Sequence, residues 1–585
     1  MEQALCSPHT NILVTLILYT LSFPLIITPG LVIGKQILEK NILPPKLISL
    51  FCFGLISLFG YLFFLIFNAD VKTAKIIGFL PLFIVIIFYC KKSFRNDIVS
   101  VLSHKDIYIP LLLMFIIGLF YLSIINIGYI EEYKCAGKNL SFIANRLFGE
   151  HSSPDYLIQK WWIDNLFNGR SPWGLFVDPN HGKTLLSDRP PMLAGIVLIY
   201  YSWVPPKLGF HFFMAMTTTL SLSWIPAMWA ILRTAKLPLL RSLLFIFTLS
   251  QTYYFLYTSV YTWPKALSGA LLTGAFILLI LEPILTRNKP NTKAIVLGSI
   301  FGGLSIMTHN STILVLIPLC LMLITPRLFP GVRLTIVGFT IVGIILLPWV
   351  SIKSSNEYSM SNISAYTLST PAEEPMPDKF LRLSAYEAAK ISYSKLTIDE
   401  IINNKINNLK SIISIPNSLN NLLDHQENHV FPIITSLQLF NIAWLLLLFS
   451  FMFNLLKKEN INSKYLEAYS PVIRKTVAVS GILSISALIV FAMINFRGGV
   501  SNIATSGIPI LLFSLLGLLV FSLRIKYIII FVILQILYFY FIIINKILND
   551  NLIILPEMVV LCVTSSLLLI CSIYRARNIF ENNNN

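Results

Sequence analysis

The sequence predicts an all-α membrane protein: a polytopic bundle of about 15 transmembrane helices with interfacial helices and two larger non-cytoplasmic loops. Of the 585 residues, 56% are hydrophobic and only 12% are charged, whereas a soluble protein carries roughly a quarter charged residues. Many apolar runs approach or exceed about 20 residues, the length that crosses the hydrocarbon core of a bilayer. Because no water reaches the backbone there, each run forms a helix.

The apolar runs that predict spanning helices lie at 11–33, 46–68, 74–90, 107–128, 209–232, 240–258, 264–282, 293–308, 311–326, 332–352, 432–456, 476–495, 503–523, 525–546 and 553–574. A further run, 191–204, is bounded by proline pairs at both ends. It is only about 14 residues long, which suits an interfacial or re-entrant helix better than a span.

The distribution of charge predicts which loops face the cytoplasm. The net charge is +17, but segments 129–190 and 353–430 hold more than half of the acidic residues and only about a third of the basic ones. The other bases gather in short loops between apolar runs, which is typical of cytoplasmic loops. If 191–204 does not span, these loops share one face, and both polar segments lie on the opposite one. The pattern excludes a nucleic-acid partner.

The chain divides into four parts: additional N-terminal transmembrane helices in 1–106, a core in 107–352 with the first outer loop at 129–190, an outer helical cap in 353–430, and C-terminal transmembrane helices in 431–585. Richness in Ile, Asn and Lys suggests an AT-rich genome. We therefore expect an integral protein of a bacterial cytoplasmic (inner) membrane, with its large loops facing the periplasm or exterior.

The first outer loop reads RLFGEHSSPDYLIQKWWIDNLFNGRSPWG and continues to LLSDRPPMLAGI. An acid, Asp155, precedes an Asn-Gly pair by about fifteen residues, and Arg189 precedes a double proline that opens an apolar helix. This arrangement resembles the GT-C glycosyltransferases, membrane enzymes that use polyprenyl-phosphate sugars and include the protein O-mannosyltransferases and the aminoarabinose transferases of lipid A. The similarity covers about 60 residues and the general helix layout, and it implies that 107–352 is a catalytic core.

The resemblance places Asp155 at the position of the catalytic acid of the family's first loop. The implied role is that of general base, because an acceptor hydroxyl must lose its proton as it attacks the sugar. Asp155 also suits the N-cap of the following helix. Glu150 is the substitute base if Asp155 only caps. The family often carries a second acid beside the first, and here Tyr156 follows instead.

Asp188 and Arg189 resemble the acid-Lys-Pro-Pro element of the aminoarabinose transferases, with Arg in place of Lys. The resemblance implies that Asp188 shapes the donor or acceptor site while Arg189 binds phosphate. The planar guanidinium suits that role because it can bind two phosphate oxygens. A local ion pair that closes the turn before the prolines is the alternative.

Three further residues, Lys265, His309 and Arg497, lie at predicted outer ends of helices. Lys265 and Arg497 are bases on the face where bases are rare, so each is a candidate to hold a lipid phosphate, with His309 beside them. Arg497 also resembles the late-loop arginine of the family. The alternative for each is contact with lipid headgroups alone.

We therefore expect a hexosyl- or pentosyltransferase that takes sugar from a polyprenyl-phosphate donor. Its partners are that lipid-linked donor, a glycan, lipid or protein acceptor, and membrane lipids. Neither the cysteines nor His151 and His181 show metal-site spacing, and a divalent cation at Asp155 stays open because some GT-C enzymes use one.

Two other functions are open. An envelope polysaccharide polymerase or ligase would carry its site in 353–430, with Arg382. A lipid-linked sugar transporter would carry ionisable groups within its spans, whereas nearly all charges here map to loops or helix ends.

Overall fold

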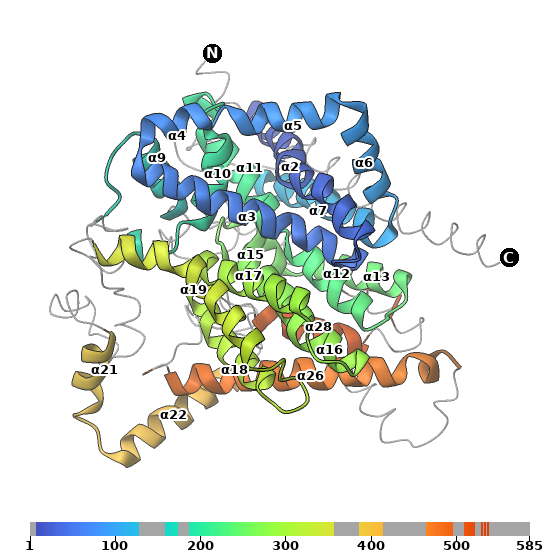
Figure 1. Cartoon of the computed structure of the whole chain (residues 1–585), viewed down its shortest axis with the longest axis vertical. Helices are drawn as coiled ribbons and strands as arrows, with labels where there is room; N and C mark the ends of the chain where they lie inside the picture. Colours follow the sequence, from blue (N-terminus) through green and yellow to red (C-terminus); the bar gives the residue numbers. More distant parts are fainter. Residues whose placement is uncertain are drawn as a thin grey trace.

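The computed structural model describes residues 8–127, 158–173, 186–355, 385–413, 464–494 and 508–520, together with isolated positions at 496 and between 528 and 536. All regular structure in these residues is helical (Figure 1). Eight segments among them are long and apolar enough to cross a bilayer, and four more apolar helices are shorter. The chain is therefore a polytopic helical membrane protein, as predicted.

The long apolar segments are formed by α2 (Pro8–Glu39), α3 (Pro45–Ala69), α4 (Val71–Ile77) with α5 (Leu80–Cys90), α7 (Lys105–Ile127), α11 (Gly209–Ser221) with α12 (Trp224–Thr234), α15 (Lys265–Phe276) with the π-helical η5 (Ile277–Leu281) and α16 (Glu282–Thr286), α19 (Val332–Ser354), and α26 (Lys464–Ile494). The other α-helices are α6 (Lys92–Leu102), α9 (Ile158–Phe167), α10 (Met192–Tyr201), α13 (Leu239–Ser250), α14 (Tyr253–Val260), α17 (Thr292–Thr308), α18 (Ile313–Leu323), α21 (Ala385–Tyr393), α22 (Ile398–Ile413) and α28 (Ile508–Val520). Three short 3₁₀ turns are η3 (Leu186–Asp188), η4 (Pro206–Leu208) and η6 (Asn310–Thr312).

Prolines and polar caps mark several helix boundaries. Helix α3 begins after Pro44 and ends before Asp70, whose carboxylate accepts the backbone N–H groups of Lys72 and Thr73 and so caps α4. Asn291 caps α17 through the N–H of Ala294. Such caps satisfy the donors that a helix leaves unpaired at its start.

The predicted spans 432–456 and 553–574, and nearly all of 525–546, lie outside the described residues.

The predicted span 240–258 is wrong as a single helix, because the chain breaks between α13 and α14. The hydroxyls of Ser250 and Thr252 bond back to carbonyls one turn earlier, each at 2.7 Å. The hydroxyl of Tyr121 donates to the freed carbonyl of Ser250 at 3.0 Å. The side-chain amide of Gln535 donates to the backbone carbonyl of Gln251 at 2.8 Å. A break buried in apolar surroundings persists because neighbouring side chains satisfy its backbone.

Helix α10 is the short helix predicted in 191–204, and it is indeed too short to span. Its place at the membrane interface stays a prediction, but all ten of its residues are buried within the protein. The reason is that it is apolar on every side, and such a helix is covered by its neighbours. It packs against α3, where two glycines allow close approach: a Cβ on Gly60 would lie 2.6 Å from the backbone nitrogen of Ile196.

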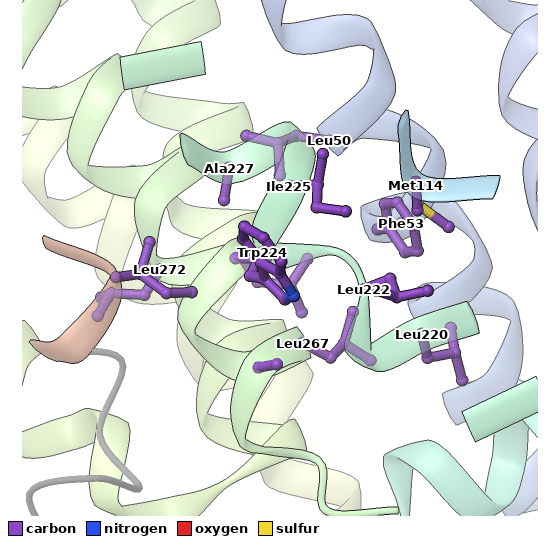
Figure 2. Close-up of a cluster of buried hydrophobic side chains, with 14 of the residues drawn as sticks. Leu50, Phe53, Met114, Leu220, Leu222, Trp224, Ile225, Ala227, Leu267 and Leu272 are labelled. Carbon is purple, nitrogen blue, oxygen red and sulfur yellow. The ribbon is translucent and has the colours of Figure 1, made fainter. Parts of the chain in front are cut away.

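The core lies where α3, α7, α11, α12 and α15 meet. Figure 2 shows Trp224 among side chains of these helices, including Leu50, Phe53 and Leu267. The indole N–H of Trp224 donates to the hydroxyl of Ser259 at 3.2 Å, which satisfies its one polar atom.

Loops that were predicted to share the cytoplasmic face contact one another. Ion pairs join them at 2.6 to 2.8 Å: Lys35–Asp97, Lys46–Glu282 and Asp106–Arg233. In Figure 1, α6 and α13 lie at the right of the bundle, whereas α9 and α21 lie at the left. The predicted grouping of loops thus agrees with these contacts. Which group faces the cytoplasm stays a prediction.

Candidate functional site

His309 lies in the turn between α17 and η6, where three residues of the predicted site come together. Its ring is buried. Burial, together with the positive charges of Arg189 and Lys265, holds the pKa of His309 well below its usual value of 6.5. Arg189 follows η3 and Lys265 begins α15. Three elements that are far apart in sequence therefore bring two cations close enough to act on one imidazole.

The hydrogen bonds of His309 define its protonation. Its Nδ1 accepts the backbone N–H of Ser311 at 3.3 Å and contacts the hydroxyl of the same residue at 2.7 Å. A neutral imidazole that accepts at Nδ1 carries its proton at Nε2. His309 is therefore a neutral ring with an N–H donor at Nε2.

Lys265 is positioned by the turn that precedes α15. Thr262 has a φ of 58°, in the left-handed region, and lies two residues before Pro264, the N-cap of α15. The Nζ of Lys265 lies 3.0 Å from the centroid of the Trp263 ring. That ring in turn packs edge-on against Tyr261, with centroids 4.3 Å apart. A cation over an indole face is held by the ring's electrostatic field, so the indole ring positions the ammonium.

Ser268 connects Lys265 to the turn that holds His309. It lies three residues after Lys265, on the same side of α15. Its hydroxyl donates to the carbonyl of Ser305 at 3.0 Å and contacts the hydroxyl of Thr312. Thr312 donates to the carbonyl of His309 at 2.8 Å. Hydroxyls buried at 0% exposure thus join α15 to both sides of the turn.

The segment that carries Arg189 is held by helix α9. The indole N–H of Trp162 donates to the carbonyl of Leu186 at 3.0 Å. The Gln159 amide donates to the carbonyl of Pro190 at 3.2 Å and accepts the N–H of Ala194 at 3.0 Å. The chain is therefore fixed on both sides of Arg189. Gln159 also supplies the capping acceptor that Pro191, the N-cap of α10, lacks.

An aromatic cluster holds α9 in place. The ring of Trp162 packs edge-on against Phe64, Trp173 and Trp349, with centroids 5.4 to 6.1 Å apart. The indole N–H of Trp173 donates to Asn68 at the end of α3, at 3.3 Å. Helices α3, α9 and α19 are thus locked together beside the Arg189 segment.

The chemistry of Arg189, Lys265 and His309 suits an anion. The side chains of Arg189 and Lys265 are hydrogen-bond donors only, and His309 offers the N–H at its Nε2. In low-dielectric surroundings such donors stabilise negative charge far more strongly than they do in water. Among the described residues, no group of three His, Cys, Asp or Glu side chains could hold a metal ion.

The other predicted site residues divide into two groups. Glu150, Asp155 and Arg497 lie outside the described residues. The backbone of Asp188 ends η3, and its side chain lies outside what the structure describes. The sequence analysis missed Ser268 and Gln159, whose bonds join elements 31 to 44 positions apart. The only signal for Ser268 was its polarity within the largely apolar α15, and Gln159, among the other polar residues of α9, gave none.

Comparisons with protein-family models, with curated proteins and with solved structures found no match to this chain.

Proposed function

We propose that the chain is a membrane glycosyltransferase that transfers a sugar from a polyprenyl-phosphate donor to an acceptor on the non-cytoplasmic face. The observation that carries the proposal is that Arg189 and Lys265 both lie close enough to the buried ring of His309 for their charges to lower its pKa. A pair of cations at the end of a bundle of apolar helices suits a ligand with a phosphate head and an apolar tail.

In the proposed reaction, the acceptor hydroxyl attacks the anomeric carbon of the donor sugar. The new carbon–oxygen bond forms as the bond from that carbon to the phosphate oxygen breaks, and the bonding pair leaves on the phosphate. Asp155 takes the proton of the acceptor hydroxyl. Arg189 and Lys265 stabilise the additional charge on the released polyprenyl phosphate, because fixed cations act where charge develops.

Binding of polyprenyl phosphate to the purified full chain tests the role of the cations. We expect Arg189→Gln and Lys265→Gln each to weaken binding by roughly tenfold or more, since a hydrogen bond to a charged group contributes about 1.5–3 kcal/mol. Binding of the uncharged polyprenol should not change. Lys75→Gln is the matched control, because Lys75 also lies over an aromatic ring, that of Phe167, at 4.2 Å. Unchanged phosphate binding in both site variants rules out the assignment.

Mass spectrometry of envelope lipids and glycans tests the reaction itself. We expect a deletion strain to lack one sugar unit, and Asp155→Asn to leave that unit missing although the protein is made and inserted. Arg382→Gln should restore it, which distinguishes this site from one in 353–430. Full complementation by Asp155→Asn contradicts the assignment of the base.

A further inference from the structure

We propose that α22 lies along the membrane surface, with a stripe of isoleucines inserted at the boundary between lipid headgroups and acyl chains. This placement replaces the expectation that the segment covers the membrane domain as a cap. It does not depend on the reaction that the chain carries out.

The first observation is that α22 exposes an apolar and a polar stripe side by side. Ile398, Ile402 and Ile406 recur every four residues and so line one side of the helix. Their exposed fractions are 77%, 50% and 42%. Asp399 and Asn403 follow at the next position of each turn and are also exposed. A helix with adjacent apolar and polar faces is typical of one lying in a membrane interface.

The second observation is that the remaining face of α22 is occupied by protein. The amide of Asn408 donates to the carbonyl of Ala492 near the end of α26, at 3.1 Å. The ammonium of Lys405 bonds to the hydroxyl of Tyr393 in α21. The ring of Tyr393 packs edge-on against Phe496, with centroids 4.9 Å apart. These contacts fix the rotation of α22 about its own axis, so its isoleucine stripe cannot turn inward.

The third observation identifies lipid as the occupant. Helix α26 is one of the candidate spans, and a row of its large apolar side chains is exposed: Ile482, Ile485, Ile489 and Met493. For a spanning helix this row is the lipid-facing side. Met493 follows Ala492, the residue to which α22 is bonded. Asn408 lies two residues after Ile406, so its bond to Ala492 brings one end of the isoleucine stripe near the end of the lipid-facing row of α26.

The overall arrangement agrees with this placement. Figure 1 shows α22 running from one end of α26 outward past the edge of the bundle, instead of across the ends of the other helices. A helix in that position meets the bilayer beside the protein. Its polar stripe, with Asp399 and Asn403, then faces water.

Spin labels at neighbouring positions test the proposal. The full chain, with its seven cysteines replaced, is reconstituted in phosphatidylcholine–phosphatidylglycerol vesicles and labelled at Ile402→Cys or at the matched control Asn403→Cys. We expect the ratio of oxygen accessibility to water-soluble nickel-chelate accessibility to be severalfold higher at position 402. High nickel accessibility at 402 overturns the proposal in favour of a solvated face. Exclusion of both reagents there overturns it in favour of a covering protein.

A second measurement keeps the native cysteines and so does not depend on the replaced background. A photoreactive benzoylphenylalanine at position 402 should crosslink to radiolabelled phospholipid, and the same residue at position 403 should not. Equal lipid labelling at the two positions, or labelling at neither, contradicts an isoleucine stripe in lipid.

Discussion

The side-chain carbonyl oxygen of Gln159 accepts the backbone N–H of Ala194 at 3.0 Å, so a residue of α9 caps the start of α10 from 35 positions away. The same amide donates to the carbonyl of Pro190. One side chain thus connects the helix that follows the first outer loop to the segment that carries Arg189. A change at Gln159 should therefore affect the position of Arg189 as well as the stability of the fold.

We expect Gln159→Ala to lower thermal stability in detergent, because the Pro190 carbonyl and the Ala194 N–H are left without their partner. Each unsatisfied buried group costs about 1–3 kcal/mol. Differential scanning fluorimetry measures the loss. Asn165→Ala is the control, since among the described residues that amide bonds within its own helix, to the Trp161 carbonyl. A melting temperature for Gln159→Ala equal to that of the control contradicts the capping role.

The contact between α3 and α10 predicts sensitivity to size at Gly195. A Cβ there would lie 2.8 Å from the carbonyl carbon of Gly60, so Gly195→Val should destabilise the chain by about 1–3 kcal/mol or more through overpacking. Gly343→Ala is the opposite case. That glycine lies inside α19 with nothing within 4 Å of a Cβ, and alanine should stabilise the helix by up to about 1 kcal/mol. Loss of stability in both variants would show that the close approach is not the cause.

His309 predicts a dependence of stability on pH. Its pKa is lower in the folded chain than the usual 6.5, so the unfolded chain binds a proton first as the pH falls. The contribution of the neutral ring is complete above about pH 6.5 and is lost as the pH falls from there toward the folded pKa. We expect His309→Gln to reduce the change of melting temperature with pH over that range. The exposed His104 provides the control, and an equal reduction by His104→Gln would count against His309 as the source.

An ion pair with a shared acceptor joins α7 to α12 at the predicted cytoplasmic end. The same carboxylate oxygen of Asp106 accepts from Arg233 at 2.7 Å and from Trp229 at 3.2 Å. A double-mutant cycle with Asp106→Asn and Arg233→Gln should show a coupling free energy of about 1–3 kcal/mol, measured by thermal unfolding. Additive losses in the cycle would mean that the pair does not couple the helices.

The sequence predicted helices well where local chemistry sets their ends. The run 46–68 matches α3 closely because Pro44 and Asp70 mark both boundaries. It failed at 240–258, because the break at Gln251 depends on Tyr121 and on Gln535, which lies 284 positions away. Hydrophobicity alone reports no such partner.

The candidate site shows the same limit. Arg189, Lys265 and His309 could be selected because each lies at the end of a predicted helix on one face of the membrane. Their mutual proximity could not be predicted, because it depends on the packing of α9, α15 and α17. Ser268 and Gln159 escaped notice because a polar residue within a helix does not reveal its bonding partner.

The complete burial of α10 bears on how the chain is assembled during synthesis. Ten apolar residues are too few to cross the hydrocarbon, so the insertion machinery has no span to release sideways into lipid. The helix must instead be held by its neighbours, and the close glycine contact places it against α3. Until α10 packs against its neighbours, it leaves an apolar segment exposed at the membrane interface, where proteases and chaperones can bind it.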